Sequence, residues 1–330
     1  MNESISPNEG PFAKAMVVGY TVLPIISLLV TVLMTYFYWD WMVLYFIVIV
    51  FEKAHLRGSR TLMWFRCLPI WEIWCSYFPV RLEKMCDLDP TKNYIFGYHP
   101  HGIICMGAFG AFGTNGAGFK DVFPGLDVHL MTLTPWFKIP FFREFILSLG
   151  LADADKESFN YILQHGPGQS CCIPLGGAAE SLDAHPGTFD LTLADRKGFI
   201  RVAMKNGATL VPTFGFGETD LFTQKVNERG SAFRDQQSKI QDAIGFAPVA
   251  LTNTKLMTPF HGLVTVVTGN PIDVPMLQYP TKEQIDEYHQ KYVAGLKEVF
   301  DSNKDKYAKN RKRSIAILGK YRPEKAKKTE

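Results

Sequence analysis

The chain has 330 residues, of which 47% are hydrophobic and 20% charged, and its formal net charge is +3. This length and composition exclude a small disulfide scaffold and a disordered chain, and they predict one large domain or two small ones with a substantial core. The six cysteines show no regular spacing and no C-x-x-C pair, which favours reduced thiols on the cytosolic side of a membrane.

Residues 15–51 are the most apolar stretch, and only Asp40 interrupts it with a charge. As one helix this stretch would extend roughly 55 Å, whereas a hydrocarbon core is about 30 Å thick. A break near Tyr38–Trp41 would divide it into two legs of roughly 16–22 residues, with Tyr and Trp at the membrane interface. We therefore predict a membrane hairpin after an N-terminal segment of residues 1–14. Whether its second leg crosses or re-enters stays open, and a buried hairpin of a soluble protein is the alternative.

Four basic residues closely follow the hairpin, whereas only Lys14 closely precedes it. The four are Lys53, Arg57, Arg60 and Arg66. Because cytosolic flanks of membrane segments are enriched in Lys and Arg, this asymmetry predicts that both termini and the domain at 52–302 are cytosolic.

The basic C-terminal tail at 303–330 carries 11 Lys or Arg against 3 Asp or Glu. Such a tail suits an anionic membrane surface or nucleic acid, or is simply solvated. Lys327 and Lys328 stand fourth and third from the end, where a dilysine signal returns membrane proteins to the endoplasmic reticulum.

Between these ends, short apolar runs alternate with amphipathic ones. Strands are predicted at 94–96, 128–132, 171–174, 209–214 and 263–268, and helices at 136–149, 156–164 and 196–206. Thr281 and Gln284 form a capping box that begins a last helix. Its predicted apolar stripe is Ile285, Tyr288, Tyr292, Leu296 and Val299. The alternation predicts an α/β domain with a mostly parallel central sheet and helices on both faces.

Several familiar motifs are absent from the sequence. It has no G-x-S-x-G hydrolase elbow and no phosphate-binding P-loop. Glycine recurs at every third position from Gly107 to Gly116, a spacing that does not fit a dinucleotide fingerprint and predicts close backbone packing. Cys171 and Cys172 lie within a predicted strand and are expected in the core.

The segment "YIFGYHPHGI" places two histidines, His99 and His101, on either side of Pro100. Proline disfavours helical geometry for the residue before it, so His99 is expected to be extended. Residues i and i+2 of an extended chain project to the same side, which predicts one shared face for both imidazoles. Gly97 and Gly102 permit tight turns and close approach of another group.

Three interpretations of this histidine pair stay open on the residues alone. An imidazole has a pKa near neutrality and suits a general base. The pair would also serve as two zinc ligands, if a third donor lay nearby. The candidate third ligands, none at a telling spacing, are His129, His165, His185 and His261. The third interpretation is that the two histidines only pack in the interior.

With its tyrosine and glycines, "NYIFGYHPHGI" resembles the His-Pro-His-Gly signature of the diacylglycerol acyltransferase type 2 family, which includes monoacylglycerol and wax-alcohol acyltransferases. The resemblance continues in order through 123–151, 173–182, 196–222 and 266–275. It implies a glycerolipid-acyltransferase-like fold and acyl transfer from acyl-CoA to diacylglycerol at the endoplasmic reticulum membrane or a lipid droplet. Monoacylglycerol or a long-chain alcohol is the alternative acceptor. No cofactor, metal or nucleic acid is expected, and a homo-oligomer is left open.

The resemblance also implies roles for site residues. One histidine would be the base and the other its helper, and His101 is favoured over His99. Glu180 is the candidate carboxylate that fixes the tautomer of the base, although a carboxylate that only interacts with a helix N-terminus is the alternative. No arginine adjoins Glu180 in the sequence, which fits an uncharged acceptor.

Other positions are assigned to substrate contact by the same resemblance. The residues expected there are Pro100, Gly102, Gly176, Gly177, Lys197, Arg201 and Lys205. The last three recur every four residues and would meet phosphates of coenzyme A or lipid headgroups, or else form a solvated face. Two functions from other classes remain as competitors: a zinc-dependent lipid hydrolase and an inactive lipid-droplet scaffold.

Overall fold

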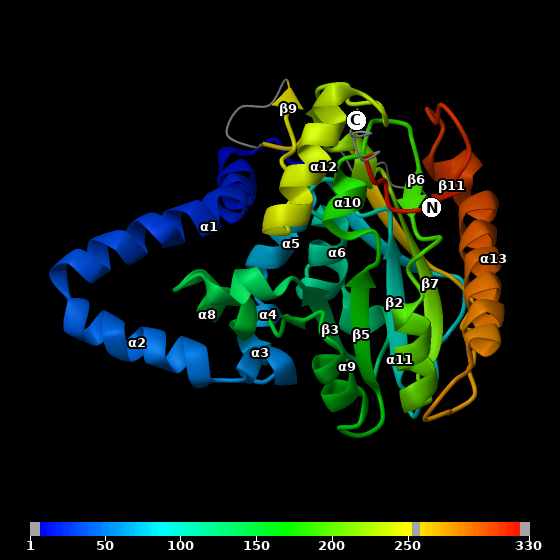
Figure 1. Cartoon of the computed structure of the whole chain (residues 1–330), viewed down its shortest axis with the longest axis horizontal. Helices are drawn as coiled ribbons and strands as arrows, with labels where there is room; N and C mark the ends of the chain where they lie inside the picture. Colours follow the sequence, from blue (N-terminus) through cyan, green and yellow to red (C-terminus); the bar gives the residue numbers. More distant parts are fainter. Residues whose placement is uncertain (1–6, 253–257, 324–330) are drawn as a thin grey trace, which may run out of the picture.

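The computed structural model describes residues 7–252 and 258–323. Two long helices project from one side of an α/β domain (Figure 1). The strands are β1 (Val80–Lys84), β2 (Tyr94–His99), β3 (Asp127–Thr132), β4 (Ala152–Asp153), β5 (Gln169–Pro174), β6 (Asp190–Thr192), β7 (Thr209–Phe216), β8 (Thr223–Gln224), β9 (Leu251–Thr252), β10 (Val264–Thr268) and β11 (Ala316–Leu318).

Seven strands form the central sheet in the order β1-β10-β7-β2-β5-β3-β4. All neighbouring pairs are parallel except β10 with β7, which are antiparallel. The predicted α/β fold with a mostly parallel sheet is therefore confirmed. Strand β2 lies at the centre between β7 and β5, so its carboxyl end opens at the middle of one sheet edge.

Helices surround the sheet and form the projection. They are α1 (Pro11–Phe37), α2 (Trp39–Phe51), α3 (Ala54–Arg57), α4 (Met63–Arg66), α5 (Ile70–Tyr77), α6 (Met106–Ala108), α7 (Phe119–Val122), α8 (Phe142–Ser148), α9 (Lys156–Leu163), α10 (Gly177–Ser181), α11 (Gly198–Asn206), α12 (Ala232–Ile244) and α13 (Lys282–Tyr307). The π-helical turn η1 (Phe109–Gly113) and the 3₁₀ turns η2 (Thr134–Lys138) and η3 (Glu218–Asp220) complete the described elements.

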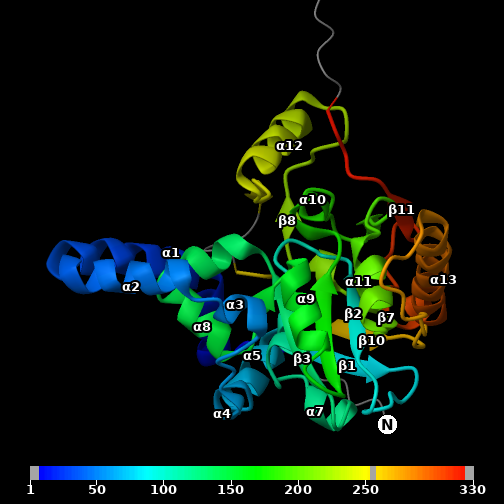
Figure 2. The ribbon, with the colours of Figure 1, turned by 60° about the horizontal axis from the view of Figure 1, so that its bottom comes forward.

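Two separate apolar cores pack against the sheet, one on each face. Tyr94, Phe96 and Tyr98 of β2 belong to the core that contains Trp74 of α5. Ile95 belongs to the other core, with Ile200 of α11 and Leu296 of α13. Figure 2 shows α11 and α13 on one side of the strands and α5 on the other. Successive side chains of a strand point to opposite faces of the sheet. Because β2 is apolar at nearly every position, its sequence predicts burial on both faces.

The capping box of the last helix is present as predicted. Thr281 Oγ1 accepts the Gln284 N–H at 3.3 Å, and Gln284 Oε1 accepts the Thr281 N–H at 2.8 Å. The predicted helix at 136–149 was wrong in its extent. It is divided into η2 and α8 because Pro140 disfavours helical geometry at the residue before it and supplies no N–H.

The apolar N-terminal stretch forms α1 and α2, which join at Tyr38 within the predicted break. Within the described chain, α1 is the one helix that is long and apolar enough to cross a membrane. With 13 residues, α2 extends only about 20 Å and does not span a hydrocarbon core of about 30 Å. The predicted second leg of roughly 16–22 residues is therefore wrong, and a hairpin in the membrane remains a proposal.

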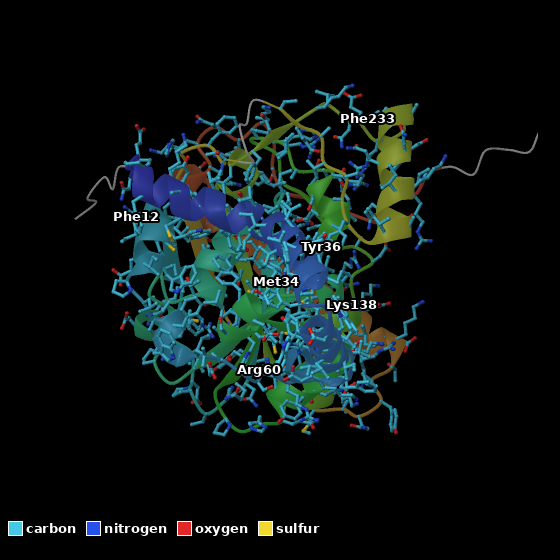
Figure 3. The ribbon with its side chains drawn as sticks, turned by 90° about the vertical axis from the view of Figure 1, so that its left-hand side faces the viewer. Phe12, Met34, Tyr36, Arg60, Lys138 and Phe233 are labelled. Carbon is cyan, nitrogen blue, oxygen red and sulfur yellow. The ribbon has the colours of Figure 1, made fainter. Side chains whose placement is uncertain are left out.

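Figure 3 faces this projection and shows Met34 and Tyr36, near the far end of α1, in front of the domain. Of the basic residues that follow the projection, Arg66 is buried and donates to the Val128 and Phe112 carbonyls at 2.7 and 2.6 Å. Arg66 therefore supplies no surface charge to support the predicted cytosolic orientation of the domain. Arg60 forms ion pairs at 2.7 Å, to Glu52 and to Glu144.

The first part of the predicted basic tail packs on the domain. Helix α13 extends into it as far as Tyr307, and β11 pairs in parallel with β6. Lys320 Nζ lies 2.6 Å from Asp242 Oδ1, so part of its charge is neutralised within the chain. Lys327 and Lys328 of the predicted dilysine signal lie outside the described residues.

Candidate active site

The candidate site is the loop that leaves β2 at the middle of the sheet edge. His99 is the last residue of β2, and it pairs in register with Phe214 of the parallel strand β7. Parallel α/β sheets place ligands at this carboxyl edge. The sequence therefore brings the histidine pair to the position where such a fold binds its substrate.

His99 is completely buried, and its Nε2 lies 3.1 Å from the Tyr292 hydroxyl of α13. That hydroxyl donates its single proton to the Gly97 carbonyl at 2.9 Å, so it accepts the Nε2–H of His99. The Nδ1 atom of His99 is then unprotonated, and it has no hydrogen-bond partner among the described residues. Burial lowers the pKa of His99 to about 3, which keeps this imidazole neutral.

The close contact with Tyr292 depends on glycine at position 97. A Cβ added there would lie 1.9 Å from the Tyr292 hydroxyl oxygen. No side chain fits at that distance, so Gly97 permits α13 to approach the end of β2.

His101 is partly exposed and is held by different partners. Its main-chain N–H donates to Glu180 Oε1 at 2.6 Å. Its Nδ1 lies 3.2 Å from the Gly102 carbonyl and 3.1 Å from Ser181 Oγ. Burial by its surroundings lowers the pKa of His101 to about 4. The prediction of one shared face assumed an extended strand through both histidines, but β2 ends at His99. Within the described chain, the two imidazoles have no hydrogen-bond partner in common.

Glu180 is buried beside the loop, but it contacts the main chain rather than an imidazole. Its Oε1 accepts the His101 N–H, and its Oε2 accepts the Thr192 N–H at 2.6 Å. Burial raises its pKa to about 7. The expected contact with the base is thus replaced by a structural one, which fixes the position of residue 101.

Glu218 is a second buried carboxyl at the loop, and the sequence analysis missed it. Its oxygens accept the Tyr98 hydroxyl at 2.6 Å and the N–H groups of Met106 and Gly107 at 2.8 and 2.7 Å. Burial raises its pKa to about 7. Since these donors lie on both sides of the histidines, Glu218 closes the loop at its base. No spacing rule connects it with the histidines, which are more than one hundred residues away.

Gly102 requires the conformational freedom of glycine. Its φ is +60°, and an added Cβ would lie 2.7 Å from Glu218 Cγ. Gly176 packs against Glu180, where an added Cβ would lie 2.2 Å from the carboxyl carbon. Gly102 and Gly176 thus permit the two carboxyls to approach the loop. Pro100 is buried between the two histidines.

Gly177, predicted for substrate contact, begins α10 and faces an arginine that the sequence did not associate with the site. Arg196 Nη2 would lie 3.9 Å from a Cβ at Gly177. This guanidinium also contributes to lowering the pKa of His101. No arginine adjoins Glu180 along the sequence, but the charge of Arg196 acts on it through space and opposes the rise of its pKa.

The predicted basic stripe lies on α11 and at its N-terminal end. Lys197 is the residue just before the helix, and its Nζ lies 2.6 Å from Asp286 Oδ1 of α13. Arg201 is exposed and Lys205 is partly exposed. An open pocket beside Lys197 is also lined by His289 and Lys297. The structure thus places only part of the predicted stripe beside a cavity.

The candidate third metal ligands are not gathered at the histidine pair. His129 Nδ1 bonds the Gly150 carbonyl at 2.7 Å, His261 Nδ1 bonds the Tyr77 carbonyl at 3.1 Å, and His185 Nε2 bonds Asn227 Oδ1 at 2.9 Å. Across residues 7–252 and 258–323, no group of three His, Cys, Asp or Glu side chains is arranged to hold a metal ion.

Comparison with known proteins adds independent information. Diacylglycerol O-acyltransferase 2 of Dictyostelium discoideum is 44% identical over 78% of this chain and 80% of its own length. Diacylglycerol O-acyltransferase 2B of Umbelopsis ramanniana is 40% identical over 92% of this chain and 90% of its own. Human 2-acylglycerol O-acyltransferase 1 is 44% identical over 88% of this chain and 87% of its own.

Among solved structures, the 1-acyl-sn-glycerophosphate acyltransferase of Thermotoga maritima aligns over 86% of this chain, with 11% identity and a TM-score of 0.40. The family profile described as diacylglycerol acyltransferase matches residues 31–317, which include the projection from its middle onward, the whole sheet and the histidine loop. On this match and these identities, the chain belongs to the diacylglycerol acyltransferase family.

Proposed function

We propose that this acyltransferase forms triacylglycerol by transferring an acyl group from acyl-CoA to the free hydroxyl of diacylglycerol, with His101 as general base. The observation that carries the proposal is the arrangement of His101. Its main chain and one ring nitrogen are held, while Nε2 has no partner within the described chain and the residue remains partly exposed.

In this reaction the acceptor oxygen attacks the thioester carbonyl carbon while its proton moves to Nε2 of His101. The C–O bond forms, the C–S bond breaks, and the imidazolium returns the proton to the departing thiolate. The products are the ester and free coenzyme A. An alcohol is a poor nucleophile at neutral pH, so such a base contributes about 10²–10⁴-fold in rate. A lowered pKa keeps His101 unprotonated at neutral pH and ready to accept this proton.

The acceptor is the finer part of the proposal. The relatives named for diacylglycerol and for 2-acylglycerol have similar identity to this chain, so monoacylglycerol is the second candidate. A long-chain alcohol is the third. No metal or other cofactor enters the proposed step, because the base and both substrates account for every proton and bond.

The experiment uses membranes from cells that express the chain, supplied with labelled acyl-CoA. Diacylglycerol, monoacylglycerol and a fatty alcohol are offered separately. Fastest labelling with diacylglycerol is expected. Faster labelling of monoacylglycerol or of the alcohol would overturn the proposed acceptor. Release of free fatty acid that a chelator abolishes would instead indicate the zinc-dependent hydrolase.

We also propose that α1 and α2 anchor the enzyme in the endoplasmic reticulum membrane, with the domain and both termini in the cytosol and with access to lipid droplets. The length and hydropathy of α1 support the anchor. Protease treatment of intact microsomes should remove the domain at 52–302, and protection of that domain would contradict the topology. Changing Lys327 and Lys328 to serine should release the protein to later compartments, and unchanged retention would contradict the dilysine signal.

A further inference from the structure

The tautomer of His101 follows from its neighbours. A carbonyl oxygen only accepts hydrogen bonds, so the 3.2 Å contact with the Gly102 carbonyl requires a proton on Nδ1. A neutral imidazole with its proton on Nδ1 has a free lone pair on Nε2. The local geometry therefore assigns the two ring nitrogens different states before any substrate binds.

Ser181 supplies the second contact with Nδ1. Its Oγ is 3.1 Å from Nδ1 and 3.3 Å from the Ile103 carbonyl, and the residue is 2% exposed. A serine hydroxyl has one proton, and Ile103 offers only an acceptor. The hydroxyl therefore donates to Ile103 and accepts from the Nδ1–H of His101.

His99 does not offer the same opportunity. Its free lone pair is on Nδ1 rather than on Nε2, and the residue is completely buried. A substrate hydroxyl would have to displace the packed loop to reach it. The two histidines thus differ in access, and the partly exposed one is the one whose ring Ser181 holds.

We propose that Ser181 is a positioning residue that fixes the orientation and tautomer of His101, so that Nε2 receives the proton of the acceptor hydroxyl. The proposal rests on the acyl transfer proposed above. When Nε2 takes the proton, the ring becomes an imidazolium, and the Nδ1–H bond to Ser181 becomes charge-assisted and stronger. Ser181 thus stabilises the charge that develops during attack. Residues 180 and 181 share the task, since Glu180 holds the main chain of His101 and Ser181 holds its ring.

The test compares Ser181→Ala and Ser181→Thr in the purified full-length enzyme, with kcat and KM measured for both substrates. Loss of one charge-assisted hydrogen bond should lower kcat of Ser181→Ala by about 10- to 100-fold and leave both KM values within about twofold. Threonine keeps the hydroxyl and should restore kcat to within about threefold of the wild type. If the alanine variant does not accumulate as folded protein, Ser181→Cys replaces it. The cysteine side chain is similar in volume to serine, and its sulfur is only a weak hydrogen-bond acceptor.

A matched control is available in α9. Ser158 is completely buried, and its hydroxyl has no partner in the described chain. Ser158→Ala should therefore leave kcat unchanged. If kcat of Ser181→Ala stayed within about twofold of the wild type, the role of Ser181 would be overturned. A kcat of Ser181→Thr as low as that of Ser181→Ala would overturn it too. Absence of acyl transfer by the wild type would overturn the proposed function itself, and the role of Ser181 with it.

Discussion

Replacing Glu180 separates a carboxylate that acts on the chemistry from one that positions the loop. In the structure its two oxygens accept the buried N–H groups of His101 and Thr192, both at 2.6 Å. Glutamine keeps one acceptor oxygen and turns an NH₂ group toward the other N–H. One buried donor is then unsatisfied, which costs about 1–3 kcal/mol. Alanine leaves both donors unsatisfied and should cost about twice as much.

These costs are a substantial fraction of a domain stability of about 5–15 kcal/mol. We expect Glu180→Gln to lower the unfolding temperature and to retain acyl transfer within about 10- to 100-fold of the wild type per folded molecule. Glu180→Ala should lose more of both. The measurement is thermal unfolding of purified protein together with the rate of labelled triacylglycerol formation, normalised to folded enzyme.

Asp153→Asn is the matched control. Asp153 is a buried carboxylate that accepts from Thr134 Oγ1 at 3.0 Å, and within the described residues it makes no hydrogen bond to the histidine loop. Its substitution should reduce stability without a specific loss of rate. A carboxylate that stabilised an imidazolium directly, as in serine proteases, would give about 10⁴-fold loss on amide substitution with little change in stability. That pattern in Glu180→Gln would refute the positioning role.

Three further predictions test other contacts. Tyr292→Phe leaves the buried Nε2–H of His99 unsatisfied and should lower the free energy of unfolding by about 1–3 kcal/mol. The control is Tyr288→Phe in the same helix, and equal free energies of unfolding for the two variants in denaturant titrations would contradict this. Glu180 and Glu218 have pKa values raised from 4.5 to about 7, so their contribution to stability is complete below pH 4.5 and is lost as pH rises through 7. The lowered pKa values of His99 and His101 give an opposite trend near pH 6.5, so the measurement compares the wild type with Glu218→Gln. Between pH 6.5 and 8 the wild type should lose stability relative to this variant by on the order of 1 kcal/mol, and an equal pH dependence of the two proteins would contradict the prediction. Thr281→Ala removes the capping box of α13 and should cost about 0.5–2 kcal/mol, whereas Thr281→Ser should cost little; equal stability of the two variants would argue against the cap.

Much of the fold was predictable because its signals are local. Strand β7 is a largely apolar run, and the capping box of α13 requires only Thr281 and Gln284. The strands β4, β6 and β11 have two or three residues and show no periodicity in the sequence. Their positions are set by pairing with distant partners, as β11 pairs with β6.

The site was predictable only in its centre. The histidine loop stood out by composition, and Glu180 by its place in a recognised block. The residues that hold the loop did not, because they reach it from far along the chain. Tyr292 lies 193 residues from His99 and was named only as part of an apolar stripe. Ser181 lies 80 residues from His101. A hydroxyl that orders an imidazole leaves no periodic or spacing signal.

The central claim is that His101 is the base for acyl transfer to diacylglycerol. The most direct measurement compares wild type, His101→Ala and the control His165→Ala, all brought to equal amounts of folded protein in membranes supplied with diacylglycerol and labelled acyl-CoA. His165 is exposed on the surface beside Tyr161, so its variant should form labelled triacylglycerol at the wild-type rate. His101→Ala should be slower by about 10²–10⁴-fold. Triacylglycerol formation by His101→Ala at the wild-type rate would contradict the account.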